Sequence, residues 1–471
     1  MSPVRRALVC ALVALGMLAT TAGSAMAHAT LVTATPPPNG RFVEGQGSSP
    51  KIVLQFSEPV QIINRSDVTI VDARDVRVDA GRPSTAAGDP RRVLIPLKGP
   101  LVPSSYTVRY RVVSSDSHTA SQAYVFGVGN ARLGVPILAG TGGLSDSSPA
   151  AVAARVVELV AHGLLVGLLA FRMLVWGPAV ARARGLSADE RETALAGGQR
   201  AFWRSFWALA VLAAVGESAV LAAKSAVVFH TGLLAAAVHP TSAYRLVAAS
   251  RFGDMLGWRS AALVALIAAG FITWTAESAG PASAGRRVPH LLMGLFGVTA
   301  LTLLASQGHA SQAPLAPLSI AADAAHLSGA AIWVGGLPCL IVVLLRAPRA
   351  LPDSGRALAS ATLSRFSRVA LWSVAVIAVT GLARMAGELS SVTQLWETAY
   401  GRDLMLKASL LAPILVLARR NRQLVAALAG GLTPTAARLR TVARSVQMEL
   451  VIAMGIITLA AILVAQIPGR A

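Results

Sequence analysis

The sequence predicts two domains of different fold class, an all-β domain followed by a polytopic α-helical membrane domain. Between residues 28 and 128, apolar and polar residues alternate over short runs such as Lys51–Phe56, which is typical of half-buried strands. From Ala150 onward, the apolar runs become long enough to cross a bilayer. The whole chain of 471 residues is 54% apolar and 14% charged, a composition too apolar for a single soluble core of this length.

Residues 1–27 have the pattern of a secretory signal peptide. Two arginines precede an apolar run, and a small-residue cleavage site ends at Ala27. Cleavage there makes His28 the first residue of the mature chain. A terminal histidine can offer both its α-amine and its ring nitrogen to one metal ion, so His28 is a candidate ligand.

A carboxylate and an imidazole, Asp116 and His118, lie two residues apart in a loop between two predicted strands. Together with His28 they supply three nitrogens and one oxygen, a donor set that suits Cu(II) in a tetragonal plane. We therefore expect one Cu(II) site in the β-domain. The alternative is that His118 is an ordinary loop histidine and His28 an ordinary mature terminus, which is the better interpretation of either residue alone.

Three segments resemble the CopC family of periplasmic copper-binding proteins: His-Ala-Thr-Leu-Val from His28, the strand at 52–59, and Ser-Ser-Asp-Ser-His at 114–118. The resemblance covers about residues 28–128. It implies a small Greek-key β-barrel, cupredoxin-like or Ig-like, that binds Cu(II) through His28, Asp116 and His118. Some CopC proteins also carry a Met-rich loop for Cu(I). This sequence has no Met between His28 and Arg172, so we expect no Cu(I) site in the β-domain.

A linker rich in Gly and Ser, residues 129–149, separates the β-domain from the membrane domain, residues 150–471. The membrane domain contains about eight long apolar runs, which must be helical because backbone groups in lipid bond internally. These predicted spans are 151–180, 203–223, 259–278, 289–306, 318–345, 368–387, 403–418 and 446–466.

The arginines of the membrane domain cluster in alternate loops, which places those loops in the cytoplasm. An even number of spans then leaves both termini outside. We expect a multi-pass protein of the plasma or inner membrane with an extracytoplasmic N-terminal domain, whose partners are copper ions and membrane lipid. The excess of Lys and Arg over Asp and Glu, 42 to 22, follows from this arrangement and predicts no nucleic-acid partner. The Arg-rich loops are 181–201, 279–288, 346–367 and 419–444.

Five ionisable residues within or beside the predicted spans lie in the outer half of the membrane. Glu158 and His162 are one helical turn apart, Asp323 and His326 share one face of another span, and His309 lies at the outer end of a third. Ionisable groups in a bilayer are costly and usually functional, so we predict a relay that receives the metal. The alternative is that these groups form hydrogen bonds between helices.

Other charged residues of the spans favour structural roles. We expect Arg384 to pair with Glu388 or Glu217, and Asp403 with Lys407. The residues predicted near the cytoplasmic ends, where long side chains can reach the interface, are Arg172, Glu277 and Glu449.

The membrane part resembles CopD, a polytopic inner-membrane copper protein. The segments that carry the resemblance are 326–336, with its Trp-Val-Gly-Gly ending, 366–371, 398–407 and 444–449, and it is strongest over about 318–466. The whole chain is thus similar to CopC–CopD fusions, which are associated with copper uptake and resistance. This implies capture of copper outside the membrane and its transport across it, by a protein that is not an enzyme.

Two other functions are compatible with parts of the sequence. A terminal histidine also holds copper in copper monooxygenases, but Asp116 would occupy a position that such enzymes leave open. A membrane redox protein is the other alternative, in which His162 and His326 would hold a haem between helices. No ATP-binding loop is present, so transport would be passive, ion-coupled or driven by trapping of copper inside.

Overall fold

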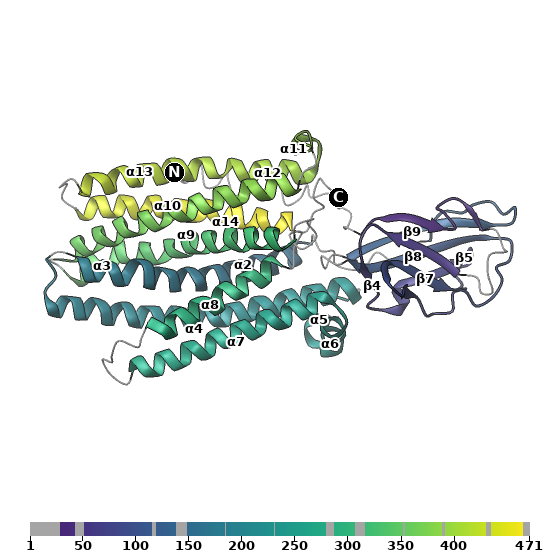
Figure 1. Ribbon diagram of the computed structural model, residues 1–471, viewed down its shortest axis with the longest axis horizontal. Helices are drawn as coiled ribbons and strands as arrows, with labels where there is room; N and C mark the ends of the chain where they lie inside the picture. The colour runs from purple at the N-terminus through teal and green to yellow at the C-terminus, as the bar shows by residue number, and fades with distance from the viewer. Residues whose placement is uncertain are drawn as a thin grey trace.

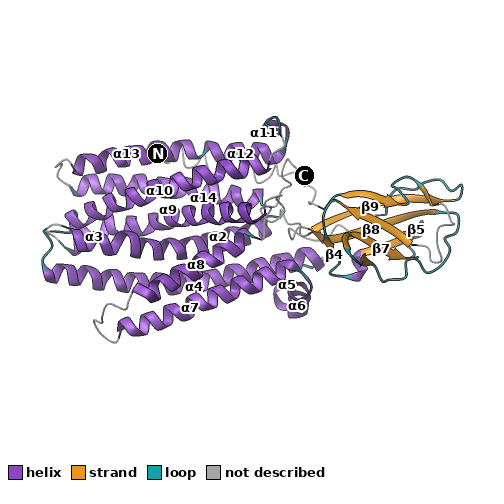
Figure 2. Cartoon of the chain, viewed as in Figure 1, coloured by secondary structure: helices purple, strands orange, loops and turns teal. Residues whose placement is uncertain are grey.

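The structure, a computed structural model, has a β-domain at one end of an elongated helical domain (Figures 1 and 2). We call the end of the helical domain that faces the β-domain the near end, and the opposite end the far end. The residues described are 29–42, 51–114, 119–137, 148–183, 185–229, 231–278, 287–306, 316–351, 354–388, 391–429 and 435–464.

The β-domain consists of two sheets packed face to face. The first sheet is antiparallel and has the order β1 (Leu31–Thr35), β3 (Lys51–Phe56), β7 (Asp89–Pro96), β6 (Ser84–Ala86). The second has the order β2 (Arg41–Phe42), β9 (Thr119–Val128), β8 (Ser105–Ser114), β4 (Val60–Gln61), and β5 (Val68–Asp72) also pairs with β8. Only the short β2 runs parallel to its partner among these pairings. The predicted all-β fold is confirmed.

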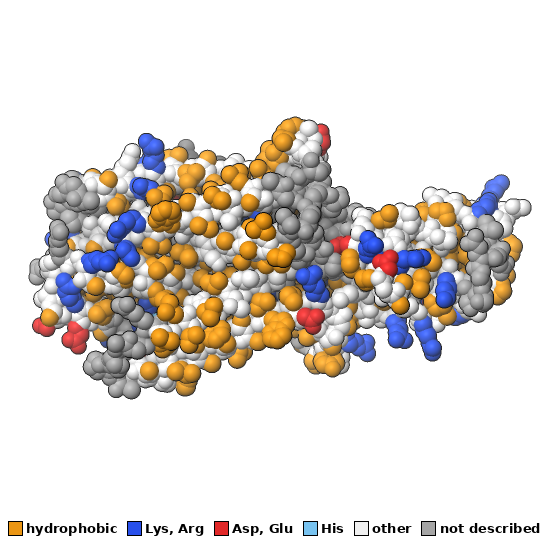
Figure 3. Space-filling view, viewed as in Figure 1, with side chains coloured by type: hydrophobic (Ala, Val, Ile, Leu, Met, Phe, Trp, Pro, Cys, Tyr) orange, Lys and Arg blue, Asp and Glu red, His pale blue; other side chains and the backbone are white. Residues whose placement is uncertain are grey.

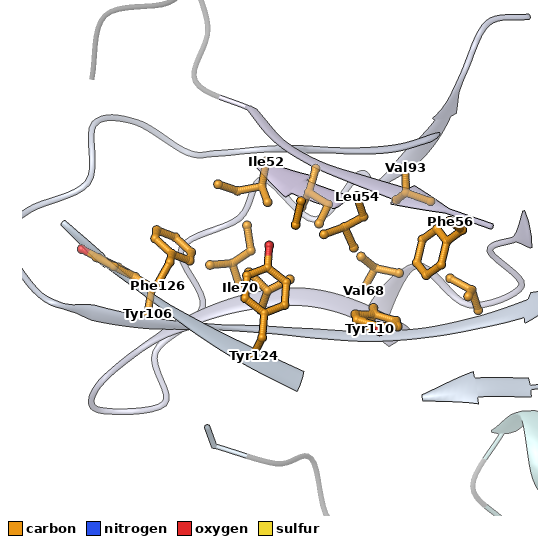
Figure 4. Packing of buried hydrophobic residues seen from close by; sticks show 14 of the residues in the cluster. Ile52, Leu54, Phe56, Val68, Ile70, Val93, Tyr106, Tyr110, Tyr124 and Phe126 are labelled. Atoms are coloured by element: carbon orange, nitrogen blue, oxygen red, sulfur yellow. The ribbon is translucent and has the colours of Figure 1, made fainter. Parts of the chain in front are cut away.

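The core of the β-domain lies between the two sheets and follows from the alternation in the sequence. Ile52, Leu54 and Phe56 of β3 are almost fully buried, whereas the residues between them are not. Figure 4 shows these side chains pointing toward the aromatic residues of the opposite sheet, where the rings of Phe56 and Tyr110 meet edge to face at 5.3 Å. Burying large side chains on one face of each sheet fixes the strand register, because a slip of one residue would expose them.

The helical domain is built from long helices that run between the near and far ends (Figure 1). They are α2 (Pro149–Ala170), which continues through the π-helix η2 (Phe171–Trp176) into α3 (Gly177–Arg182), α4 (Ala188–Phe229), α7 (Arg251–Ser278), α8 (Arg287–Ala305), α9 (Ala316–Ala350), α10 (Gly355–Glu388), α12 (Ala399–Ser409), α13 (Leu411–Ala429) and α14 (Ala436–Leu463). Three short helices, α5 (Leu233–Val238), α6 (Pro240–Ala249) and α11 (Gln394–Glu397), lie at the near end.

Within the described residues, seven helices are long and apolar enough to cross a membrane, and they correspond to seven of the eight predicted spans. The eighth, 403–418, is not one continuous helix. It falls on α12 and α13, which are separated at Leu410, and α13 carries three arginines within four residues. Figure 1 nevertheless shows α12 and α13 end to end along the bundle, and both contact α14.

The surface of the helical domain agrees with a membrane-spanning bundle. Figure 3 shows a flank covered by hydrophobic side chains, with Lys and Arg gathered toward the far end. The chain is therefore a multi-pass membrane protein by the length, apolarity and number of its helices.

The β-domain packs directly on the near end of the bundle. Val113 of β8 belongs to a buried apolar cluster with Ala151, Val220 and Phe252 of the helices. The guanidinium of Arg111 donates a hydrogen bond to the carbonyl oxygen of Val227 in the last turn of α4. Gln61 of β4 accepts a hydrogen bond from the backbone N–H of Arg251 at 3.2 Å. These contacts fix the orientation of the β-domain relative to the helices in this structure.

Candidate functional site

The predicted Cu(II) ligands His28, Asp116 and His118 all lie outside the described residues, but the segments that flank them do not. Val113 of β8 pairs with Thr119 of β9, so the described residues on the two sides of the loop lie side by side. Thr30, two residues after His28, exchanges hydrogen bonds with Ser57, at 3.1 and 2.9 Å.

Ser114, the last described residue before the loop, and Thr30, near the start of the β-domain, lie at the same end of the sheets. Ser57 follows β3, and three residues later Val60 of β4 pairs with Ser114, the last residue of β8. Ser57 is also hydrogen-bonded to Thr30. The segment 57–61 therefore connects the strand end next to Asp116 and His118 with the residues that follow His28. This end of the β-domain is the one that contacts the helices, through Val113 and Gln61.

The membrane pair Glu158 and His162 forms part of a buried polar network that we call the near cluster, which comprises Glu158, His162, Glu217, Arg259 and Ser260. Arg259 of α7 has no exposed surface and lies at its centre. Its Nη2 is 2.5 Å from Glu158 Oε1, and its Nε donates to Glu217 Oε1 at 3.2 Å. The near cluster is thus a set of compensated charges shared by α2, α4 and α7.

The two remaining side chains of the near cluster, His162 and Ser260, both contact the carboxylate of Glu217. His162 Nε2 lies 3.3 Å from Glu217 Oε1, and the hydroxyl of Ser260 donates to Glu217 Oε2 at 2.5 Å. The other ring nitrogen of His162 lies 3.0 Å from the carbonyl oxygen of Glu158. Both carboxylates therefore lie within ion-pair distance of cationic or imidazole groups, and buried charges require such compensation.

The second predicted pair lies on α9 and has different partners. Asp323 Oδ1 is 2.7 Å from Arg384 Nη1 of α10, and His326 Nδ1 is 3.1 Å from the hydroxyl of Thr380. The predicted pairing of Arg384 with Glu217 is wrong, because Glu217 belongs to the near cluster. The sequence suggested it because each residue lies near the outer end of its span, but the two helices direct these side chains to different neighbours.

Asp323 and His326 line a cavity of about 770 Å³, which we call the near cavity. Glu158 also lines it, whereas His162 does not. The four predicted relay residues are therefore not brought together as one set, and His309, the fifth, lies outside the described residues. Since His162 and His326 do not line one shared cavity and each has its own partner, their arrangement does not favour a haem held between them.

No three His, Cys, Asp or Glu side chains converge on a possible metal position anywhere in the part of the chain that the structure describes. The near cavity nevertheless offers further donors that the sequence analysis did not identify. The thioethers of Met385, Met405 and Met454 line it, together with the phenol of Tyr400. These residues come from α10, α12 and α14, so no spacing within one helix could have revealed them.

A second buried network, which we call the far cluster, lies nearer the far end and comprises Arg172, Trp203, Glu277 and His290. Glu277 binds Arg172 at 2.5 Å, His290 at 3.3 Å and the indole N–H of Trp203 at 2.8 Å. Only 4% of the Glu277 side chain is exposed, so the prediction that it reaches the membrane interface is wrong. Glu449 is also buried, and accepts a hydrogen bond from Asn421 at 2.7 Å.

One titratable group of the β-domain lies close to the domain contact. Burial raises the pKa of Asp67 to about 6, and the positive charge of Arg111 opposes that rise. Arg111 is the residue that bonds to α4, so the charge of Asp67 faces the main polar contact between the domains.

Comparison with known proteins gives two family matches. The model described as the CopC domain matches residues 31–129, and the model described as copper resistance protein D (CopD) matches residues 360–463. The copper transport protein CutJ of Bacillus subtilis (strain 168) is 25% identical over 394 residues, which cover 84% of this chain and 67% of CutJ.

Two solved structures match the N-terminal part. CopC from Methylosinus trichosporium OB3b is 26% identical, with 23% of this chain and 99% of that chain covered and a TM-score of 0.18. PcoC from Escherichia coli, described as a methionine-rich copper resistance protein, is 25% identical, with 22% and 100% covered and a TM-score of 0.18.

The CopD match begins after α9. Glu158, His162, Asp323 and His326 therefore lie outside it, whereas Arg384 and the three cavity methionines lie within it.

Proposed function

This chain carries a CopC domain followed by a CopD domain, and from that premise we propose that it captures copper with the β-domain and transports it across the membrane, in copper homeostasis and resistance. The observation that carries the proposal is the contact between the two domains. The end of the β-domain with the hairpin loop packs on Ala151, Val220 and Phe252, and these residues also line the near cavity. A captured ion would thus be released next to the cavity.

The proposed Cu(II) site consists of His28, Asp116 and His118, and the proposed path begins at the near cavity. His326, whose described side-chain partner is a neutral hydroxyl, and the three methionines are the available donors there. Arg384 neutralises Asp323 in the absence of metal, and an arriving cation would take its place. Holding donor and acceptor in one chain raises the effective concentration of the loaded site at the cavity.

The proposed orientation places the near end outside the cell membrane and the far end in the cytoplasm. It is supported by the arginines gathered toward the far end and by the secretory pattern of residues 1–27. We infer a role in binding and transport rather than catalysis, because both matched families are copper-handling proteins.

The function is tested by measuring cellular copper content at fixed external copper in cells with and without this chain. We expect more copper in cells that express it, and equal contents would contradict transport into the cell. A variant that retains the helical domain but carries His118→Ala is the control for capture, since it should lose accumulation at low external copper and recover at high copper.

The Cu(II) site is tested on the full chain with one extra residue placed before His28. The added residue removes the terminal amine from the chelate, so we expect a large loss of Cu(II) affinity and of nitrogen hyperfine structure in the EPR spectrum. Unchanged affinity would contradict the four-donor site without affecting the proposal that the chain transports copper.

A further inference from the structure

A second cavity, of about 1930 Å³, lies toward the far end and is lined by Arg172, Glu277 and His290 of the far cluster. We call it the far cavity. Three residues line both cavities: Leu164 of α2, and Gly335 and Pro338 of α9. The two cavities therefore adjoin at these residues, with one layer of side chains and backbone between them.

The separating layer is closely packed. A Cβ atom on Gly167 would lie 2.4 Å from the carbonyl oxygen of Ala331, and one on Gly335 would lie 2.6 Å from the carbonyl oxygen of Gly163. The backbones of α2 and α9 thus touch, as small residues allow in membrane helices. An ion cannot pass between them in this conformation.

The regular hydrogen-bond pattern is interrupted in α9 at this layer and in α2 beyond it. Pro338 has no N–H, so the carbonyl of Val334, which lines the near cavity, cannot receive the usual helical bond from residue 338. On α2, the π-helix Phe171–Trp176 begins one turn beyond the packed glycines and supplies lining residues of the far cavity. Such interruptions occur often at functional positions, where they allow small local shifts.

We propose that Leu164, Gly335 and Pro338 form the permeation barrier of the protein, at which a cation passes from the near cavity to the far cavity. The inference rests on the proposed function and identifies where the path is closed. Leu164 is the movable part, because a side chain can rotate whereas the glycine contact is backbone against backbone. Cys339, the next residue after Pro338, lines the far cavity and not the near one, so it lies on the cytoplasmic side of the barrier.

Cys339 also provides a reporter that does not depend on copper. The sequence has two cysteines, and the other, Cys10, lies in the predicted signal peptide. In a Cys10→Ser background, we would treat sealed vesicles of either orientation with a small, cationic, membrane-impermeant methanethiosulfonate reagent and measure modification of Cys339 by mass spectrometry.

We expect modification from the cytoplasmic face and little from the outer face. Leu164→Ala should raise the rate of Cys339 modification from the outer face about tenfold, which is equivalent to about 1.4 kcal/mol in the barrier. Leu164→Trp should leave that rate low and should reduce copper accumulation. The matched control is Leu165→Ala, since Leu165 is buried against other helices and lines neither cavity. The Leu165→Ala protein should be less stable than the parental protein, yet its Cys339 should still be modified mainly from the cytoplasmic face.

The proposal is overturned if Cys339 reacts equally from both faces of the parental protein, if it reacts from neither face, or if Leu164→Ala and Leu165→Ala behave alike. The outcomes also separate it from the proposed function. Suppose that Cys339 is labelled from the cytoplasmic face alone, that Leu164→Ala removes this difference between the faces, and that the parental protein accumulates no copper. That result would retain the barrier and reject copper transport. Copper accumulation unaffected by either Leu164 variant would retain transport and reject the barrier.

Discussion

The two acid–histidine pairs of the helical domain look alike in the sequence and differ in the structure. Glu158 and His162 lie in a buried network around Arg259, which has no exposed surface, although Glu158 also lines the near cavity. Asp323 and His326 both line that cavity, where Arg384 pairs with Asp323 and the hydroxyl of Thr380 contacts His326. Spacing on a helix therefore identifies polar faces, but the partners on neighbouring helices decide whether a pair lies within a buried charge network or faces a cavity.

The largest effect expected from this difference is the loss of Arg259. Arg259→Leu would leave Glu158 and Glu217 buried with reduced compensation, which should cost about 3–5 kcal/mol. We expect poor insertion and early loss of the monodisperse peak when detergent-solubilised protein is heated before size-exclusion chromatography. Arg384→Leu is the comparison, because its partner Asp323 is at the cavity, and it should cost less. Equal stability of Arg259→Leu and the parental protein would contradict a structural role for the near cluster.

The second prediction separates the two pairs by function. Asp323→Asn and His326→Gln should insert at normal levels and load Cu(II) in the β-domain, yet lose most copper accumulation. Glu158→Gln and His162→Gln should lower the amount of folded protein, with accumulation falling only in proportion. The measurements are membrane protein content and cellular copper in the same cells. Parental copper accumulation by both cavity variants at normal expression would exclude them from the path.

The far cluster allows a milder test of whether a closed network stabilises the fold. Trp203→Phe keeps the aromatic ring but removes the N–H that donates to Glu277. Because Arg172 and His290 remain, the cost should be about 1–2 kcal/mol. A lower temperature of unfolding in detergent, with copper accumulation unchanged per folded molecule, is the expected result. A loss of accumulation without a loss of stability would instead give Trp203 a role in transport.

The smallest expected effect concerns the β-domain, where the half-buried Asp67 lies near Arg111. The pKa of Asp67 in the folded protein, about 6, lies above its ordinary value of 3.8. The protonated form therefore contributes stability that is fully present below pH 3.8 and is lost as pH rises through 6. Asp67→Asn should remove this dependence and protect the domain by about 1–2 kcal/mol at pH 7, after allowance for partial solvent screening. Hydrogen exchange of Val68–Asp72 at pH 5 and 7 measures it, and an unchanged pH dependence in the variant would contradict it.

Much of the fold could be predicted because its signals are local. Alternation in β3 and the length of the apolar runs depend only on neighbouring residues, and they predicted the all-β domain and seven of the helices correctly. The run 403–418 is not among these seven helices, because Leu410 divides it between α12 and α13 and hydropathy does not register that division.

The composition of the clusters could not be predicted in the same way. Arg259 is the first residue of the predicted span 259–278, but α7 begins at Arg251 and places Arg259 two turns into the helix. His290 was likewise placed at the edge of a span and is buried against Glu277. In Arg259-Ser260, an arginine and a serine stand together at the start of a long apolar run. This combination is the sequence signal that could have indicated a buried network.

The hydrogen bond between Arg111 and the carbonyl of Val227 has a consequence for how the two domains depend on each other. The carbonyl groups in the last turn of α4 have no helical donors, and the partial negative charge of the helix dipole is concentrated there. Arg111 supplies both a donor and a positive charge, so the β-domain acts as the C-terminal cap of a membrane helix. Because the acceptor is backbone, the cap does not depend on which side chain stands at position 227. A helical domain without its β-domain would therefore have to end α4 in another way.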